Sequence, residues 1–151
     1  MSAMPSDLVQ VGDRTRMMTF GLQGKRAAWV RIVYVLCLAA GTYTHASILA
    51  RHGWRWNYGG KPIGTVLFWS ALTILDPIVA ILLFARPRLG ITLLMLLMLS
   101  DVIHNTWIIY VYGGVVWMVA DQWVFLIFVL ATAQTLWNAA QKQSQALESQ
   151  A

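Results

Sequence analysis

The sequence predicts an all-α membrane protein, an antiparallel bundle of four transmembrane helices. Hydrophobic residues make up 58% of the 151 residues and charged residues only 11%, whereas soluble domains carry about 25% charged residues. Four apolar runs are each long enough to cross a hydrocarbon core of about 30 Å as a helix. Four runs of this length cannot close a barrel, and lipid does not tolerate open sheet edges, so helices are expected.

The predicted helices span about residues 27–50, 65–85, 89–111 and 115–139. The links between them are short: "RHGWRWNYGGKPIG", then "RPR", then "YGG". Pro87 in the second link suits a helix boundary. Because short links place neighbouring helices antiparallel, we expect an up-down bundle over residues 27–140.

The segments outside the bundle are polar. Residues 1–26 contain no early apolar core followed by a small-residue cleavage site, so we expect no cleaved signal peptide. This N-terminal arm is predicted to be cytoplasmic, either lying on the inner membrane surface or disordered. Residues 141–151, "QKQSQALESQA", are expected to form a polar cytoplasmic tail.

The distribution of Lys and Arg predicts the orientation, because cytoplasmic loops are enriched in these residues. Eight lie on the side of the two termini and three on the other side, which favours cytoplasmic termini in an inner (cell) membrane. The first group comprises Arg14, Arg16, Lys25, Arg26, Arg31, Arg86, Arg88 and Lys142, and the second Arg51, Arg55 and Lys61. Interfacial belts are expected at Trp29 and Trp137 on the inner side and at Trp54, Trp56, Trp117 and Trp123 on the outer side.

Two function classes are disfavoured by composition. The net charge of +5 lies in the links between apolar runs, so membrane topology explains it and no nucleic-acid partner is expected. Cys37 is the only cysteine, so the chain has neither an internal disulfide nor a CxxC motif for thiol–disulfide exchange. We interpret Cys37 as a small apolar packing residue.

Ionisable side chains inside the apolar runs are the main clue to function. Asp76 and Asp101 lie near mid-helix. At that depth an aspartate raises the free energy of membrane insertion by about 2.5–3.5 kcal/mol. His45, His104 and Asn105 add three more polar side chains. Asp101, His104 and Asn105 have i, i+3, i+4 spacing, which places them on one face of the third helix.

The first two helices carry matching polar stripes. Trp69, Thr73 and Asp76 share one face of the second helix, and Tyr34, Thr42 and His45 share one face of the first. Lipid offers such groups no partner, so we expect all three faces to line one interior cleft, open toward the outer side near Asp121 and Gln122. Pro77 frees the carbonyl of Thr73 and either widens this cleft through a kink or is only a packing kink.

Two interpretations of the cleft follow from these residues. Buried polar pairs can act as interhelical glue, worth about 0.6 kcal/mol each. Alternatively, the cleft binds a lipophilic small molecule and moves a proton or grips an amine. In this interpretation Asp101 and His45 are proton donor and acceptor, and His104 and Asn105 orient them.

The remaining residues of this predicted site would contact the ligand. Asp76 would be a second carboxylate or a structural partner of Thr73. The aromatic walls would suit a developing cation. The predicted ligand-binding set is Tyr34, Thr42, Trp69, Thr73, Asp76, Asn105 and Trp107.

The arrangement resembles the EXPERA domain, the fold of the emopamil-binding sterol isomerases and the sigma-2 receptor. The shared features are four short-linked helices, His45 late in the first, Pro77 before "LLFARPRLGI" in the second, and a polar cluster late in the third. The resemblance covers about residues 30–140. It implies a pocket for a sterol- or isoprenoid-like molecule.

The resemblance is incomplete at the residues that carry isomerisation. His45 matches the first-helix histidine of the isomerases, but Leu49 stands where they have a glutamate. Their second-helix glutamate also has no counterpart, and Asp76 directly precedes Pro77 instead. The resemblance therefore implies a lipophilic pocket more directly than it implies isomerisation.

Two further alternatives stay open. His45 and His104 lie on different helices at similar predicted depth, as a bis-histidine haem b would require, in an electron-transfer subunit. Intramembrane carboxylates also occur in proton relays, so the chain could belong to a proton-coupled transporter or be a non-catalytic subunit of a homodimer or larger complex. Apart from haem, the sequence suggests no cofactor, and it suggests no metal.

Overall fold

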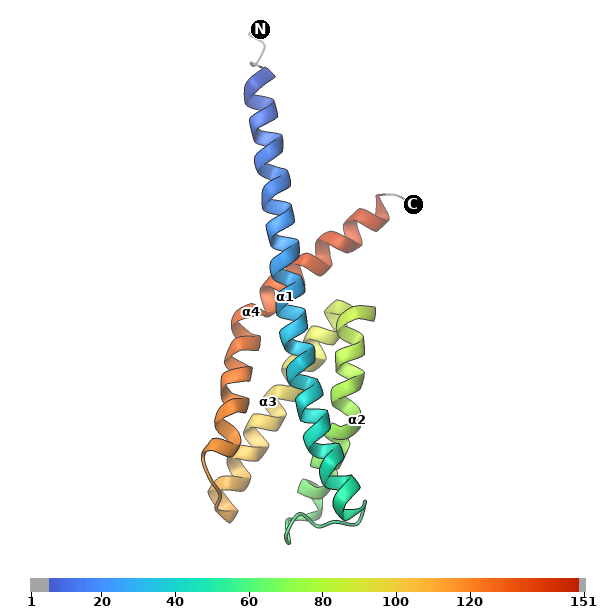
Figure 1. Cartoon of the computed structure of the whole chain (residues 1–151), viewed down its shortest axis with the longest axis vertical. Helices are drawn as coiled ribbons and strands as arrows, with labels where there is room; N and C mark the ends of the chain where they lie inside the picture. Colours follow the sequence, from blue (N-terminus) through green and yellow to red (C-terminus); the bar gives the residue numbers. More distant parts are fainter. Residues whose placement is uncertain (1–5, 150–151) are drawn as a thin grey trace.

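A computed structural model describes the backbone of residues 6–149 and the side chains of residues 24–117, 119–145, 148 and 149, and it shows four long helices joined by short links (Figure 1). They are α1 (Ser6–His52), α2 (Ile63–Ala85), α3 (Pro87–Tyr112) and α4 (Trp117–Glu148). Each helix packs against two neighbours, in the pairs α1 with α2, α2 with α3, α3 with α4, and α1 with α4. Within the described residues the two diagonal pairs do not pack, so the bundle has a four-cornered cross-section. The predicted all-α antiparallel bundle is confirmed.

Each helix contains a segment long and apolar enough to cross a membrane. These segments are Gly24–His52, Ile63–Ala85, Pro87–Tyr112 and Val119–Gln145. Large apolar side chains cover the outside of the bundle, among them Leu67, Ile81, Ile103, Val124 and Ile127, all more than half exposed. An apolar exterior of this kind suits lipid and not water. The protein is therefore a multi-pass membrane protein by helix length and hydropathy.

The two ends of the bundle differ. Both chain termini and the α2–α3 turn lie at one end, called here the terminal end (Figure 1). Residues 53–62 and 113–116 link the helices at the opposite end, called here the loop end. Residues 6–26 continue α1 as one straight helix that projects beyond the bundle (Figure 1).

The α2–α3 turn is tight because of a glycine. A Cβ atom on Gly90 would lie 2.6 Å from the backbone nitrogen of Leu83 and 2.8 Å from the carbonyl oxygen of Leu82. Pro87 begins α3, where its missing N–H is not needed. The backbone N–H of Arg86 donates to the carbonyl oxygen of Leu82 at 2.9 Å and closes the last turn of α2. The short link "RPR" is thus a helical hairpin with direct backbone contact.

The apolar core fills the terminal half of the bundle. Its fully buried side chains include Tyr34, Leu83, Leu94, Val129 and Leu136, one or more from each helix. Protein interiors of this kind are close-packed and leave few voids. The polar residues of the spans lie beyond this core, toward the loop end, and the cavities described next lie there too.

Candidate functional site

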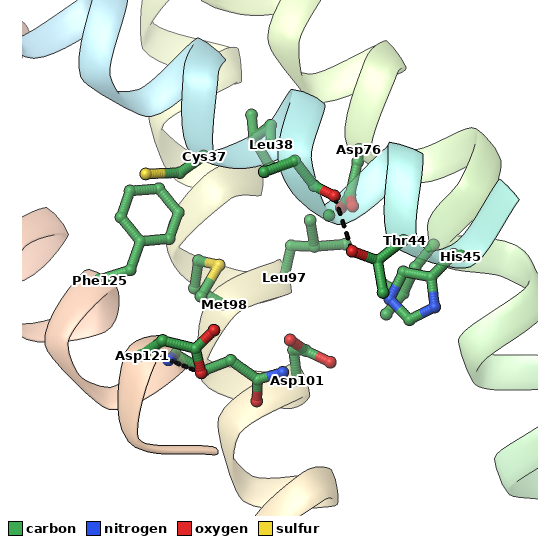
Figure 2. Close-up of a pocket in the computed structure, with 14 residues that line it drawn as sticks. Cys37, Leu38, Thr44, His45, Asp76, Leu97, Met98, Asp101, Asp121 and Phe125 are labelled. Atoms are coloured by element: carbon green, nitrogen blue, oxygen red, sulfur yellow. Dashed lines mark hydrogen bonds between the residues drawn. The ribbon is translucent and has the colours of Figure 1, made fainter. Parts of the chain in front are cut away.

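A cavity of about 400 Å³ lies in the loop half of the bundle, and all four helices contribute to its wall (Figure 2). We call it the acidic cavity, because three carboxylates line it. Its apolar wall consists of Leu38, Ala40, Gly41, Leu72, Leu97, Met98 and Phe125, with Cys37 beside them. Its polar side chains are Thr44, His45, Asp76, Asp101, Asp121 and Gln122.

Asp76 is the most enclosed ionisable group of this cavity. Its side chain is only 6% exposed, and within the described residues it makes no hydrogen bond. The carboxylate lies against α1 at Gly41, where an added Cβ would be 2.7 Å from Oδ2. The absence of a side chain at Gly41 is what gives this carboxylate its place between α1 and α2. Asp76 is thus buried without a partner and faces an open volume.

Asp101 belongs to a hydrogen-bonded network centred on Asn105. The Nδ2 group of Asn105 donates to Asp101 Oδ1 at 2.8 Å and to Gln122 Oε1 at 2.9 Å. Trp69 Nε1 donates to Asn105 Oδ1 at 2.6 Å. The network connects α2, α3 and α4 and uses the whole amide of Asn105. It holds Asp101 in a defined position at the cavity wall.

His45 contributes the imidazole from α1. Its Nδ1 atom is buried and has no hydrogen-bond partner. The same side chain lines the acidic cavity and a second cavity next to it. A buried imidazole nitrogen normally has a partner. The unpaired Nδ1 of His45 is an exception to this rule, on a side chain that lines both cavities.

The second cavity, of about 590 Å³, lies beneath the links of the loop end, and we call it the loop cavity. It shares Thr44, His45 and Gln122 with the acidic cavity. Its other walls are largely aromatic and aliphatic and come from the α1–α2 link and the ends of α2 and α3, with Trp56, Tyr58, Trp69, Ile108 and Ile109. The two adjoining cavities therefore combine an apolar mouth with an acidic floor.

His104 lies apart from the other predicted catalytic residues. It lines neither cavity and packs among aromatic rings, with centroid distances of 4.6 Å to Phe68 and 5.9 Å to Trp107. Its Nε2 atom is buried without a partner. One step along a helix turns a side chain by about 100°. Asn105 therefore faces the interior while His104 faces α2, although both fall within the broad polar face predicted from the sequence.

Four of the predicted ligand contacts also lie elsewhere. The Tyr34 hydroxyl donates to the Val129 carbonyl oxygen at 3.2 Å and bonds the Thr132 hydroxyl at 2.8 Å, inside the apolar core. Trp107 is 47% exposed on the outside of α3. The Thr42 hydroxyl donates to a carbonyl oxygen of its own helix. The Thr73 hydroxyl is buried and unpaired, so it is not the hydrogen-bonding partner of Asp76.

Several residues of the cavity were absent from the predicted site. Gln122 and Asp121 stand at the start of α4, and the sequence placed them only near the outer mouth of the cleft. Cys37 lines the cavity although we interpreted it as packing. Gln122 could have been found as a partner for Asn105, since both are amides at matching depth on consecutive antiparallel helices. No sequence signal marks Thr44, whose hydroxyl donates to its own helix.

The haem alternative does not fit this arrangement. A bis-histidine haem needs both imidazoles at one cavity, and His104 lines neither cavity that His45 lines. In the part of the chain whose side chains are described, no group of three or more His, Cys, Asp or Glu residues is placed to hold a metal ion.

Comparison with known proteins found no relative of this chain. No family model matches the chain, and neither the curated proteins nor the solved structures contain a significant match. The resemblance to the EXPERA domain stays a prediction.

Proposed function

We propose that this small multi-pass membrane protein binds a lipophilic small molecule in the acidic cavity. The observation that carries the proposal is that His45, Asp76 and Asp101, from three different helices, line one cavity with apolar walls. Ligand sites are typically concave and mostly apolar, with a few convergent polar groups. A lipophilic ligand is also what the resemblance to the EXPERA domain implies.

The unpaired groups favour a ligand site over interhelical glue. Glue requires polar groups that satisfy one another, as Asn105 does with Trp69 and Gln122. Asp76 makes no hydrogen bond with any described side chain or backbone group, and Nδ1 of His45 has none either. Leaving a buried polar group unpaired costs about 1–3 kcal/mol. An occupant that hydrogen-bonds to these groups would offset that cost.

The charge of the acidic cavity's wall indicates which polar group the ligand carries. Of the described residues, three carboxylates and no Lys or Arg line the acidic cavity. The favoured group at its floor is a hydrogen-bond donor such as an amine or a hydroxyl, held by Asp76 and Asp101. The apolar body of the ligand would extend along Leu72 and Phe125 toward the aromatic loop cavity.

Proton transfer is the sharper form of the proposal. A carboxyl group and an imidazole on one cavity wall can act as general acid and base toward a bound molecule. Asp101 would be held in place by Asn105 while His45 exchanges a proton with the ligand from the opposite helix. Migration of a double bond in an isoprenoid- or sterol-like ligand needs only these two proton steps.

The test is identification of what the protein retains. The protein is purified in mild detergent, and molecules extracted from it are identified by mass spectrometry. We expect a lipophilic molecule at near-stoichiometric amounts in the unaltered protein, reduced in Asp76→Asn and His45→Ala. Ser100→Ala is the matched control, because Ser100 is an exposed neighbour of Asp101 that bonds only its own helix. Equal retention in all four proteins, or none in any, would overturn the proposal.

A further inference from the structure

A third hollow lies at the terminal end, separated from the acidic cavity by the apolar core. It has a volume of about 420 Å³ and runs between the α2–α3 turn and α4. We call it the arginine groove. Its wall includes Phe84, Arg86, Arg88, Leu89, Gln143 and Ser144.

The charge of this groove is positive and unopposed. Arg86 and Arg88 are exposed, and neither forms an ion pair with any side chain that the structure describes. Among the residues whose side chains are described, no Asp or Glu lines the groove. The guanidinium of Arg88 lies 6.0 Å from the ring centroid of Trp137, which ties the groove to α4. An anion is therefore the ligand that this electrostatic field favours.

The depth of the groove indicates what carries the anion. The two arginines stand in the turn between two spans, at the end of the apolar segments Ile63–Ala85 and Pro87–Tyr112. Phe84 and Leu89, which also line the groove, are 57% and 44% exposed on the surface that faces lipid. The guanidinium groups thus lie directly beside exposed apolar side chains at the edge of the membrane. This arrangement matches a phospholipid, in which the phosphate is joined to acyl chains. Basic pockets between transmembrane helices bind anionic headgroups in this way.

We propose that the arginine groove binds the phosphate headgroup of an anionic phospholipid. Arg86 and Arg88 hold the phosphate, since a guanidinium can bond two of its oxygens at once. Phe84 and Leu89 contact the first part of the acyl chains. A soluble phosphate would use only the guanidinium groups. An acidic segment of a partner protein would not need the apolar contacts of Phe84 and Leu89.

The test uses delipidated, purified protein and phosphatidylglycerol as the probe, with binding followed by native mass spectrometry or by thermal stabilisation. Phosphatidylcholine and acyl-free glycerophosphoglycerol serve as comparison probes. We expect Arg86→Gln/Arg88→Gln to bind phosphatidylglycerol roughly 30-fold more weakly, about fivefold for each arginine near a charged surface. Arg51→Gln/Arg55→Gln, at the loop end, is the matched control and should bind as the unaltered protein does.

Several outcomes would overturn the proposal. One is that the groove variant binds phosphatidylglycerol as tightly as the unaltered protein does. Another is that the loop-end control loses as much affinity as the groove variant. The third is that glycerophosphoglycerol binds as tightly as phosphatidylglycerol. If the groove variant fails to fold, Arg86→Lys/Arg88→Lys and a salt titration of the unaltered protein replace it. Binding that is retained by the lysine variant, and that weakens with salt in the unaltered protein, supports the site. Binding indifferent to salt rejects it.

Discussion

The carboxylate of Asp76 occupies the space where a side chain at Gly41 would begin, since a Cβ there would lie 2.7 Å from Oδ2. This approach places a carboxylate that is enclosed and has no hydrogen-bond partner among the described residues against α1. The substitution Gly41→Ala should therefore push the Asp76 carboxylate away from α1. Because a hydrogen bond to a charged group is worth about 1.5–3 kcal/mol, we expect retention of the bound molecule to fall about tenfold or more.

The matched control for this prediction is Gly64→Ala. Gly64 is also helical, and an added Cβ meets nothing within 4 Å. It should leave retention unchanged and raise stability by at most about 1 kcal/mol, the helix propensity of Ala over Gly. Retention is measured by mass spectrometry of the purified proteins. Normal retention in Gly41→Ala would show that the ligand does not depend on the position of Asp76.

The Asn105 network predicts a separate effect on stability. Asn105→Ala removes the bonds to Trp69 and Gln122, which connect three helices. Interhelical hydrogen bonds in membranes average about 0.6 kcal/mol, so the loss of two should destabilise the bundle by about 1–2 kcal/mol. Unfolding by a denaturing detergent measures it. In the control Thr92→Ala, the lost hydroxyl bonds only its own helix, so the change should stay within about 0.5 kcal/mol.

Tyr34 should affect stability without affecting the ligand. Its hydroxyl bonds Val129 and Thr132 inside the core, away from both cavities. Tyr34→Phe should lower the free energy of unfolding by about 0.5–1.5 kcal/mol and leave retention as it is. Detergent unfolding and mass spectrometry on one preparation give both values. Loss of the ligand in Tyr34→Phe would instead support its predicted place in the site.

The predicted orientation calls for a labelling experiment. In a Cys37→Ser background, Asn57→Cys places a thiol in the loop-end link and Gln141→Cys places one at the terminal end, and both positions are exposed. In intact cells a membrane-impermeant maleimide should label residue 57 and not residue 141. The reverse pattern would contradict the prediction from the Lys and Arg distribution that the termini are cytoplasmic.

The sequence predicted the helices well because their signal is local. Apolar runs of sufficient length and short links were enough to give the number of helices and the antiparallel order. The far ends of α1 and α4 were not predicted. Helices that extend beyond the bundle carry no apolar pattern in their outer turns.

The site was harder to predict because it depends on rotation between helices. Asp76, Asp101 and His45 were predicted to meet, and they line one cavity. His104 was assigned to the same face as Asn105, yet it packs against Phe68 on α2. Spacing gives the angle between two side chains on one helix, but not the direction in which the neighbouring helix lies. For the same reason the sequence could not show that Tyr34 bonds α4 within the core.

The central claim is that a lipophilic molecule can reach the carboxylates of the acidic cavity. Dicyclohexylcarbodiimide, a small apolar reagent, adds covalently to carboxyl groups, and peptide mass mapping locates the adduct. In native membranes we expect modification at Asp76 and Asp101, slowed by the molecule extracted from the protein and lost at position 76 in Asp76→Asn. Modification confined to exposed carboxyl groups such as Glu148, with Asp76 and Asp101 untouched, would contradict the account.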